Sequence, residues 1–376
     1  MRFWWIVLSL LIGSTACAPD EAEDRLPTSG GDLDEVMIIV DDIDFQTDFD
    51  SMLIYAFFEP YPGLPQLYEP LLPIKIREWK RYSNAPDLFG KYRQLAFVGI
   101  LEEKSDISLK VQQAIGKDLF QQAYRDDELF FAVERNKYSK PQLVLYLFAP
   151  TREILIERVL EHKHKLVNTV KEHENKRLKK LLLGGKKLAR FTEHVAAHMH
   201  FSMDMPGDYS VMAKNDSFIW VRAEEAVIDK QENLTKQIKR DWLVRSYDVE
   251  DNLDESKLTN PALDEQPVTD YPFILRDNLL ARHIMGKDSS YHPYTDIVRP
   301  LFQEQQQYGE VDALVSRGLW RLDLPFMGGP FINATFYTPD STHLIMVDGF
   351  IYAAGSDKRR LIREYEALLS TIKYVR

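Results

Sequence analysis

The chain has 376 residues and a net charge of −11, from 47 Lys and Arg against 58 Asp and Glu. A composition with 45% hydrophobic and 28% charged residues excludes a disordered, collagen-like or multi-span membrane protein. The acidic balance argues against nucleic-acid binding, and the single cysteine excludes both a disulfide framework and a cysteine-based zinc site.

Residues 1–16 have the pattern of a lipoprotein signal peptide. Arg2 precedes an apolar run of ten residues, and three small residues lie directly before Cys17. As a helix the run would rise only about 15 Å, half of a bilayer core, so it is too short to span a membrane. We expect cleavage before Cys17 and acylation, including palmitate, at this residue. Ser14 departs from the aliphatic residue usual there, and the alternative is a cysteine behind an ordinary signal peptide.

Residues 17–34 are predicted to form an acidic flexible tether, because they contain prolines, glycines and acids with almost no apolar side chain. The cluster at 20–24 is interpreted either as a surface-export tag or as a solvated linker. An acylated chain on this tether would be anchored to the outer membrane, on its periplasmic or cell-surface side.

The folded body is predicted to be α+β, with mixed or antiparallel sheets and packed helices. We expect an N-terminal half at 35–197 and a C-terminal half at 198–376, similar in that each is closed by a strand-to-helix unit. A single mixed sheet is the alternative. The expected strands are 35–40, 73–79, 94–101, 143–148, 198–204, 218–222, 241–249 and 344–352. The expected helices are 51–58, 109–124, one after Thr151 and one after Ser356 or Asp357, and 251–272 is expected to be a loop.

Several blocks of sequence resemble the domain of unknown function 4837 family. They are Arg317-Gly318-Leu319-Trp320, Met327-Gly328-Gly329-Pro330-Phe331, Gly349-Phe350-Ile351-Tyr352-Ala353, Lys358-Arg359, Glu366-Ala367, Arg276-Asp277, Gly63-Leu64-Pro65-Gln66 and Glu69-Pro70. The resemblance extends over most of the mature chain. It implies an envelope lipoprotein of Bacteroidota and carries no reaction or site residue with it.

Three histidines form the first candidate site. His194 and His198 are four residues apart, with His200 just beyond, and such a spacing on one helix face can bind Zn²⁺. The order of residues is not His-Glu-x-x-His, and polar and apolar residues alternate from His198 onward. A solvated junction between a helix and a strand is therefore the competing interpretation.

A basic segment forms the second candidate. Between Lys163 and Arg190 there are ten Lys or Arg and two Glu, in a chain that is acidic overall. This excess could contact an anionic envelope component or an envelope protein, with Lys176, Arg177, Lys179 and Lys180 as the expected contact residues. The alternative is a long solvated helix that ends at Gly184-Gly185.

Three further segments have weaker signals. Ser356, Lys358 and Arg359 open a predicted helix and could bind an anion, or could serve only as a cap. Five aspartates at 41–50 follow the first predicted strand, where capping and solvation compete with a binding site. Gly328-Gly329-Pro330 is expected to form a tight turn or bulge.

The sequence therefore predicts a lipid-anchored binding or scaffolding protein of the cell envelope, with no cofactor and no nucleic-acid partner. It leaves open whether the protein is an enzyme and favours a protein that is not. The alternatives are a metal-dependent envelope hydrolase that uses the three histidines, and a surface glycan-binding protein. The glycan hypothesis needs exposed Trp320 or Tyr352, whereas core burial is the competing expectation.

Overall fold

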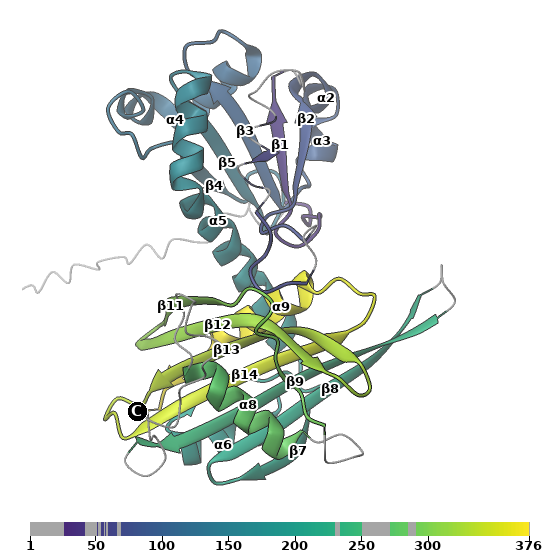
Figure 1. Ribbon diagram of the computed structural model, residues 1–376. Helices are drawn as coiled ribbons and strands as arrows, with labels where there is room; N and C mark the ends of the chain where they lie inside the picture. Colours follow the sequence, from purple (N-terminus) through teal and green to yellow (C-terminus); the bar gives the residue numbers. More distant parts are fainter. Residues whose placement is uncertain are drawn as a thin grey trace, which may run out of the picture.

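The computed structural model describes residues 26–41, 51, 54–55, 57, 59–65, 69–229, 234–249, 271–284 and 291–375. These residues form two large β-sheets of different construction and one two-stranded sheet, and one long helix, α5, connects the two large sheets (Figure 1). The first sheet is mixed and has five strands, and the second is antiparallel and has eight. The predicted α+β body with packed helices is confirmed, as a mixed α/β architecture.

The first sheet has the strand order β2-β1-β3-β5-β4, in which only the edge strand β4 is antiparallel. Its strands are β1 (Val36–Val40), β2 (Ile74–Glu78), β3 (Gln94–Ile100), β4 (Phe131–Arg135) and β5 (Leu143–Ala149). Every residue of β1, β3 and β5 is buried. Continuous apolar runs suit this position, because helices cover both faces of the sheet.

Two helical layers enclose the first sheet. Met37 and Ile39 of β1 face a core with α2 (Trp79–Asn84), α3 (Pro86–Phe89) and α4 (Asp106–Gln122). The alternate β1 side chains face the apolar stripe of α5 (Arg152–Leu183). The period of two along β1 therefore divides its side chains between two cores.

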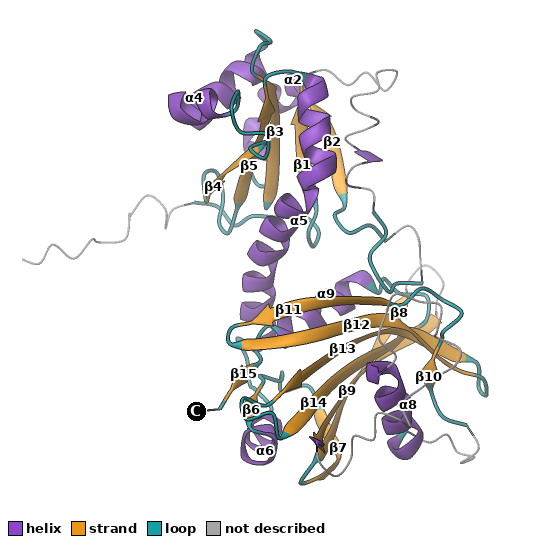
Figure 2. Cartoon of the chain, turned by 60° about the vertical axis from the view of Figure 1, so that its left-hand side comes forward, coloured by secondary structure: helices purple, strands orange, loops and turns teal. Residues whose placement is uncertain are grey.

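Helix α5 belongs to both halves of the molecule. It begins at Thr151, whose hydroxyl accepts a hydrogen bond from the backbone N–H of Ile154, as predicted for this cap. Its 32 residues extend beyond the first sheet, so that its second half packs against α9 (Arg359–Leu369) of the other half. Both views show α5 crossing from one sheet to the other (Figures 1 and 2).

The second sheet has the order β10-β12-β13-β14-β9-β8-β7, and β11 also pairs with β12 (Figure 2). Its strands are β7 (Ser210–Asn215), β8 (Phe218–Asp229), β9 (Leu234–Asp248), β10 (Tyr294–Thr295), β11 (Phe302–Tyr308), β12 (Val311–Leu322), β13 (Met327–Tyr337) and β14 (His343–Ala353). Helix α8 (Tyr271–His283) covers one face, while α6 (Ala189–Met199) and α9 cover the other. A short pair of strands, β6 (Phe201–Ser202) and β15 (Lys373–Tyr374), lies beside the sheet.

Both predicted strand-to-helix units are present, as β5 followed by α5 and β14 followed by α9. The sheets that they close differ in strand direction and order. The strand predicted at 198–204 is wrong in extent, because α6 continues to Met199 and His200 then adopts a left-handed conformation with φ 58°. The predicted alternation of buried side chains after Met199 is present, although only Phe201 and Ser202 form strand pairs.

The turn predicted at Gly328-Gly329 is also wrong, since both glycines lie within β13 and pair with β12. A Cβ atom on Gly329 would lie 2.0 Å from the carbonyl oxygen of Ile351, so the glycine permits close approach of two strands. The helix predicted at 51–58 is described only in part. The loop predicted at 251–272 lies outside the described residues except for its last two, which open α8.

A substitution at Gly349 tests how closely α9 packs against the second sheet. A Cβ atom on this β14 residue would lie 2.6 Å from the ring of Tyr365 on α9 and 2.8 Å from that of Trp242. We expect Gly349→Ala to lower the free energy of unfolding by about 1–3 kcal/mol, because the two rings must move to admit the methyl group. Urea denaturation measures this, with Gly185→Ala as a control because its Cβ meets nothing within 4 Å. Equal stability of the two variants would contradict the packing account.

Candidate functional site

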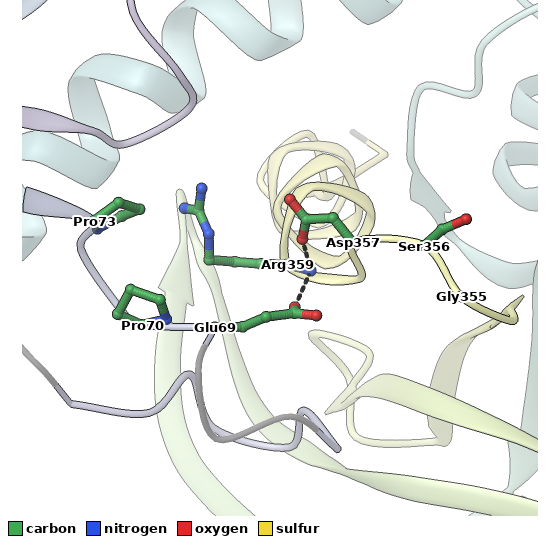
Figure 3. Close-up of a pocket in the computed structure, with 7 residues that line it drawn as sticks. All are labelled: Glu69, Pro70, Pro73, Gly355, Ser356, Asp357 and Arg359. Atoms are coloured by element: carbon green, nitrogen blue, oxygen red, sulfur yellow. Dashed lines mark hydrogen bonds between the residues drawn. The ribbon is translucent and has the colours of Figure 1, made fainter. Parts of the chain in front are cut away.

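The two halves of the molecule meet at the N-terminus of α9, where a carboxylate from the first half caps the helix (Figure 3). The side chain of Glu69 accepts a hydrogen bond from the backbone N–H of Arg359 at 2.6 Å, and another from that of Lys358 at 3.3 Å. Asp357 accepts from the same N–H of Arg359 at 2.9 Å. The positive end of the helix is therefore occupied by carboxylates of the chain itself.

The residues predicted to bind an anion line or adjoin this junction. A cavity of about 420 Å³ lies there, lined by Glu69, Ser356, Arg359 and their neighbours. Lys358 is buried, and its ammonium group donates to the carbonyl oxygen of Ser356 at 3.0 Å. Burial raises the pKa of Glu69 and lowers that of Lys358. The backbone donors expected to receive an external anion here hold Glu69 instead.

Asp34, which precedes β1, makes the deepest contact between the halves. Its carboxylate is fully buried and accepts hydrogen bonds from the guanidinium groups of Arg359 at 3.0 Å and Arg363 at 2.8 Å. Arg363 is also fully buried and uses a second nitrogen to reach Asp34 at 3.1 Å. One carboxylate of the first half thus binds two arginines of α9 in the second half.

Glu366, one turn further along α9, extends this ionic cluster. Its carboxylate contacts Arg363 at 2.5 Å, Arg317 of β12 at 3.1 Å and Lys171 of α5 at 3.4 Å. Burial alone would raise the pKa of Glu366, but these three cations outweigh it and hold the pKa well below its usual value. The cluster therefore joins α5, α9 and β12 through a carboxylate that stays ionised.

A second buried ion pair lies within the C-terminal half. Arg276 of α8 has no exposed surface and donates to Asp348 of β14 at 2.9 Å. Its guanidinium carbon lies 3.9 Å from the centre of the Phe331 ring. Asn333 donates to the same Asp348 oxygen at 3.2 Å. Arg276, Phe331, Arg317 and Glu366 are all among the residues that carry the family resemblance, so these motif residues form the buried framework of this half.

The two aromatic residues of the glycan hypothesis lie within the C-terminal half. Trp320 is buried, and its indole N–H donates to the carbonyl oxygen of Ile351 at 3.0 Å. Tyr352 is half-buried against the core beneath α8. A buried ring cannot stack on a sugar, so Trp320 has a structural contact in place of the one that the hypothesis requires.

The three predicted metal-binding histidines do not converge. His194 is buried on α6, and its Nε2 lies 2.9 Å from the backbone oxygen of Asn215, a contact that directs this nitrogen toward the sheet. The rings of His194 and His198 are 4.7 Å apart, whereas His200 ends the helix and lies beside His343. Among the described residues, no three His, Cys, Asp or Glu side chains are grouped so that they could hold a metal ion.

The predicted contact residues lie on the second half of α5. Lys176 and Lys180 are exposed and Lys179 is half-exposed. Arg177 differs from them, because it donates to the buried carboxylate of Glu174 at 2.8 Å. The three lysines are three and four residues apart and so share one helix face. The basic helix is therefore present with its lysines exposed to solvent, whereas Arg177 is held by its hydrogen bond to Glu174.

Other predictions concern residues outside the described ranges. These are the signal peptide, Cys17, most of the tether and four of the five aspartates at 41–50. Only Asp41 of the five is described.

Strand β1 lies between β2 and β3, so the strand order reverses at its carboxyl end, where α/β sheets often place binding sites. No helix in the described part combines the length and the apolar character needed to cross a bilayer.

The ionic cluster has no local sequence signal, because its members are far apart in the chain. Asp34 and Arg363 are separated by 329 positions. The prediction of a flexible tether at 17–34 is wrong for Asp34, because its carboxylate is fully buried against α9. The only signal was indirect, since Arg317 and Glu366 appear among the family-like blocks without a visible role. Apart from this signal, charged residues in a helix are predicted to lie on its solvent-exposed face.

The cluster predicts a specific dependence of stability on pH. Because the folded pKa of Glu366 is lowered, its contribution is complete above the unfolded pKa of about 4.3 and is lost as the pH falls below it. We expect Glu366→Gln to cost about 3–5 kcal/mol of unfolding free energy at pH 7, because Arg363, Arg317 and Lys171 each lose a contact with a buried carboxylate. The difference from the unsubstituted chain should shrink below about pH 4.

Urea unfolding at a series of pH values measures this difference. Exposed Glu157 of α5, replaced by Gln, is the matched control and should change stability by less than about 0.5 kcal/mol. A cost for Glu366→Gln that stays constant from neutral to acid pH would show that its ionised form is not what stabilises the interface.

Comparisons with known proteins assign families to both halves. Residues 189–371 match the domain of unknown function DUF4837, and residues 29–182 match the domain of unknown function DUF8532. The resemblance to the first family is thus confirmed for the C-terminal half, whereas the blocks at 63–70 fall within the second family. Neither description names an activity, and a comparison with curated proteins finds no match. The chain therefore carries a DUF4837 domain that includes its antiparallel sheet and a DUF8532 domain that includes its mixed sheet.

Proposed function

We propose that this protein is a lipid-anchored component of the cell envelope, held at the outer membrane through acylated Cys17, that works by binding and not by catalysis. The sequence at residues 1–34 supports the anchor, since a short apolar run and three small residues precede the only cysteine. The acidic segment after Cys17 supports a tether that lets the two folded halves stand clear of the lipid.

The binding surface that we propose is the basic face of α5, defined by Lys176, Lys179 and Lys180. None of the three makes an ion pair within the described part of the chain. By contrast, Lys163, Lys165 and other cations earlier on α5 pair with carboxylates of the first half. Three lysines that share one face of a helix and have no ion-pair partner among the described residues, in a protein of net charge −11, are the observation that carries the proposal.

The fold favours a binding role for this face. Helix α5 is held at both ends, by the core of the first sheet and by α9, so its lysines are presented without rearrangement. Because a rigid surface loses little conformational entropy on binding, even modest electrostatic attraction is enough to hold an anionic partner. The partner class is an anionic component of the envelope, such as a phosphate-bearing lipid surface.

Replacing the lipidation site tests the anchor. We expect Cys17→Ala to abolish incorporation of labelled palmitate and to move most of the chain from the membrane fraction to the soluble fraction, because no other acylation site is available. Thr15→Ser, which keeps a small residue before the cysteine, should behave as the unsubstituted chain does. Palmitate labelling that persists in Cys17→Ala would contradict the anchor.

Charge reversal tests the binding surface. We expect the triple variant Lys176→Glu, Lys179→Glu, Lys180→Glu to reduce retention on phosphatidylglycerol vesicles at low salt at least tenfold, since each lysine near an anionic surface contributes about 1 kcal/mol. The measurement uses the Cys17→Ala background, so that acyl chains do not dominate the binding. High salt should weaken binding of the unsubstituted surface, because exposed charges are screened.

The matched control reverses three exposed cations of the first half, Lys80, Lys104 and Lys117, and so changes the net charge equally. It should retain most of the binding. Equal losses in the two triple variants would mean that net charge alone governs retention, and no loss in either would contradict an electrostatic role for α5.

A further inference from the structure

A second cavity, of about 430 Å³, opens where α5, α9 and the segment before β1 meet. Four arginines from three parts of the chain line it, and we call it the arginine cleft: Arg93 precedes β3, Arg177 lies on α5, and Arg359 and Arg360 begin α9. Guanidinium groups that converge from separate elements are positioned by the fold and not by local sequence.

Carboxylates also surround the arginine cleft, because Asp32, Asp357 and Glu364 line it, but two of the guanidinium groups share one carboxylate. Arg93 and Arg177 both approach the single carboxylate of Glu174, at 3.6 and 2.8 Å, and Gln94 donates to that carboxylate at 2.6 Å as well. The Nε atom of Arg93 is buried without a hydrogen-bond partner among the described residues. This Nε is the atom that lies 3.6 Å from Glu174, and a terminal nitrogen of the same side chain donates to the carbonyl oxygen of Gly31 at 3.1 Å. The guanidinium group of Arg93 is therefore held inside the protein.

The two arginines of α9 differ in exposure, with Arg359 buried and Arg360 exposed. The side chain of Arg360 is 66% exposed, and its one ion pair within the described residues is with Glu364, at 3.3 Å. Arg240 also reaches this carboxylate, at 3.4 Å. Arg359 uses its two terminal nitrogens on Asp34 and on the carbonyl oxygen of Leu33. The arginine cleft therefore has one exposed guanidinium group, that of Arg360, and one that is held by hydrogen bonds, that of Arg359.

The arrangement selects a class of ligand. Burial lowers the pKa of Arg93, and the neighbouring Arg177 lowers it further, against the opposing effect of Glu174. An added anion would relieve this repulsion. Several guanidinium forks suit a phosphate group, which offers three terminal oxygens, better than a carboxylate, which offers two.

One wall of the arginine cleft is apolar. Leu178 of α5 is buried there, while Leu181, one turn further on, is 61% exposed. An exposed leucine beside cations suits the start of an acyl chain next to a phosphate, whereas a free phosphate would leave this leucine uncovered. The same cations could take the phosphate from either source.

We infer that the arginine cleft binds a phosphate group, through Arg93, Arg177 and Arg360. The inference deepens the proposed function, because it rests on an anionic partner at α5 and adds the chemical group that is recognised. It predicts a defined site with a saturable stoichiometry of one, in contrast to the diffuse attraction of the three lysines.

The test titrates the full acylated chain, held in phosphatidylcholine nanodiscs, with two probes by isothermal calorimetry. The probes are inorganic phosphate and short-chain dihexanoyl phosphatidic acid, with empty discs as the blank. We expect Arg360→Gln and Arg177→Gln each to raise the Kd about tenfold, since each removes a charge-assisted contact. Exposed Arg81 of α2, replaced by Gln, is the matched control and should leave the Kd unchanged.

Each outcome decides the proposal. Saturable binding that the two arginine cleft variants weaken and Arg81→Gln does not would support it. Phosphatidic acid at least tenfold tighter than phosphate would identify a lipid headgroup as the source, and equal affinities a soluble phosphate. No binding of either probe, or equal effects of all three variants, would overturn it. Because Arg360 is exposed, its variant should fold, and thermal unfolding verifies this.

The test also separates this site from the proposed binding face. Lys176, Lys179 and Lys180 do not line the arginine cleft, so their charge reversal should weaken vesicle retention and leave the phosphate titration within about twofold of the unsubstituted chain. Phosphate binding with undiminished vesicle retention in the lysine variant would support the cleft and contradict the face. Weakened vesicle retention in the lysine variant, without phosphate binding by the unsubstituted chain, would contradict the phosphate site in the cleft and leave the lysine face supported.

Discussion

The structure depends on one buried carboxylate, that of Asp34, which binds Arg359 and Arg363 of α9. Asp34 lies just before β1 with a left-handed backbone at φ 55°, a conformation that aspartate and asparagine tolerate better than most residues. Taking these charges out of water is costly, so the contact persists only because its geometry is good and each charge is paired. It fixes where the first strand of one half stands relative to the last helix of the other.

The proposed functions follow from that placement. With α9 fixed against α5, Arg359 and Arg360 come to face Arg93 and Arg177, which belong to the other half, and the arginine cleft exists only because the halves are joined. The same junction leaves the lysines of α5 at the surface. A family match for each half accordingly describes the parts, whereas the sites proposed here depend on how the parts meet.

Local sequence predicted the elements that local physics determines. The apolar runs of β1, β3 and β5, the Thr151 cap and the strand-to-helix units are all recognisable from short windows. Local sequence does not predict the structure at positions that depend on distant partners. Gly329 has the sequence pattern of a turn, although it lies in a strand against the backbone of Ile351. Asp34 has the sequence pattern of a tether, although it binds Arg363. Of the predicted site residues, the histidines diverge because His200 leaves the helix, and Arg177 is tied to a carboxylate that the sequence could not pair with it.

Hydrogen–deuterium exchange of the Asp34→Asn chain tests most directly whether this one contact holds the halves together. Asparagine keeps the left-handed backbone and removes only the charge. If the account is right, exchange should rise both at β1 and in the first turns of α9, which are 329 positions apart at Asp34 and Arg363. Faster exchange confined to the residues next to Asp34, with α9 as protected as before, would contradict the claim that this carboxylate joins the two halves.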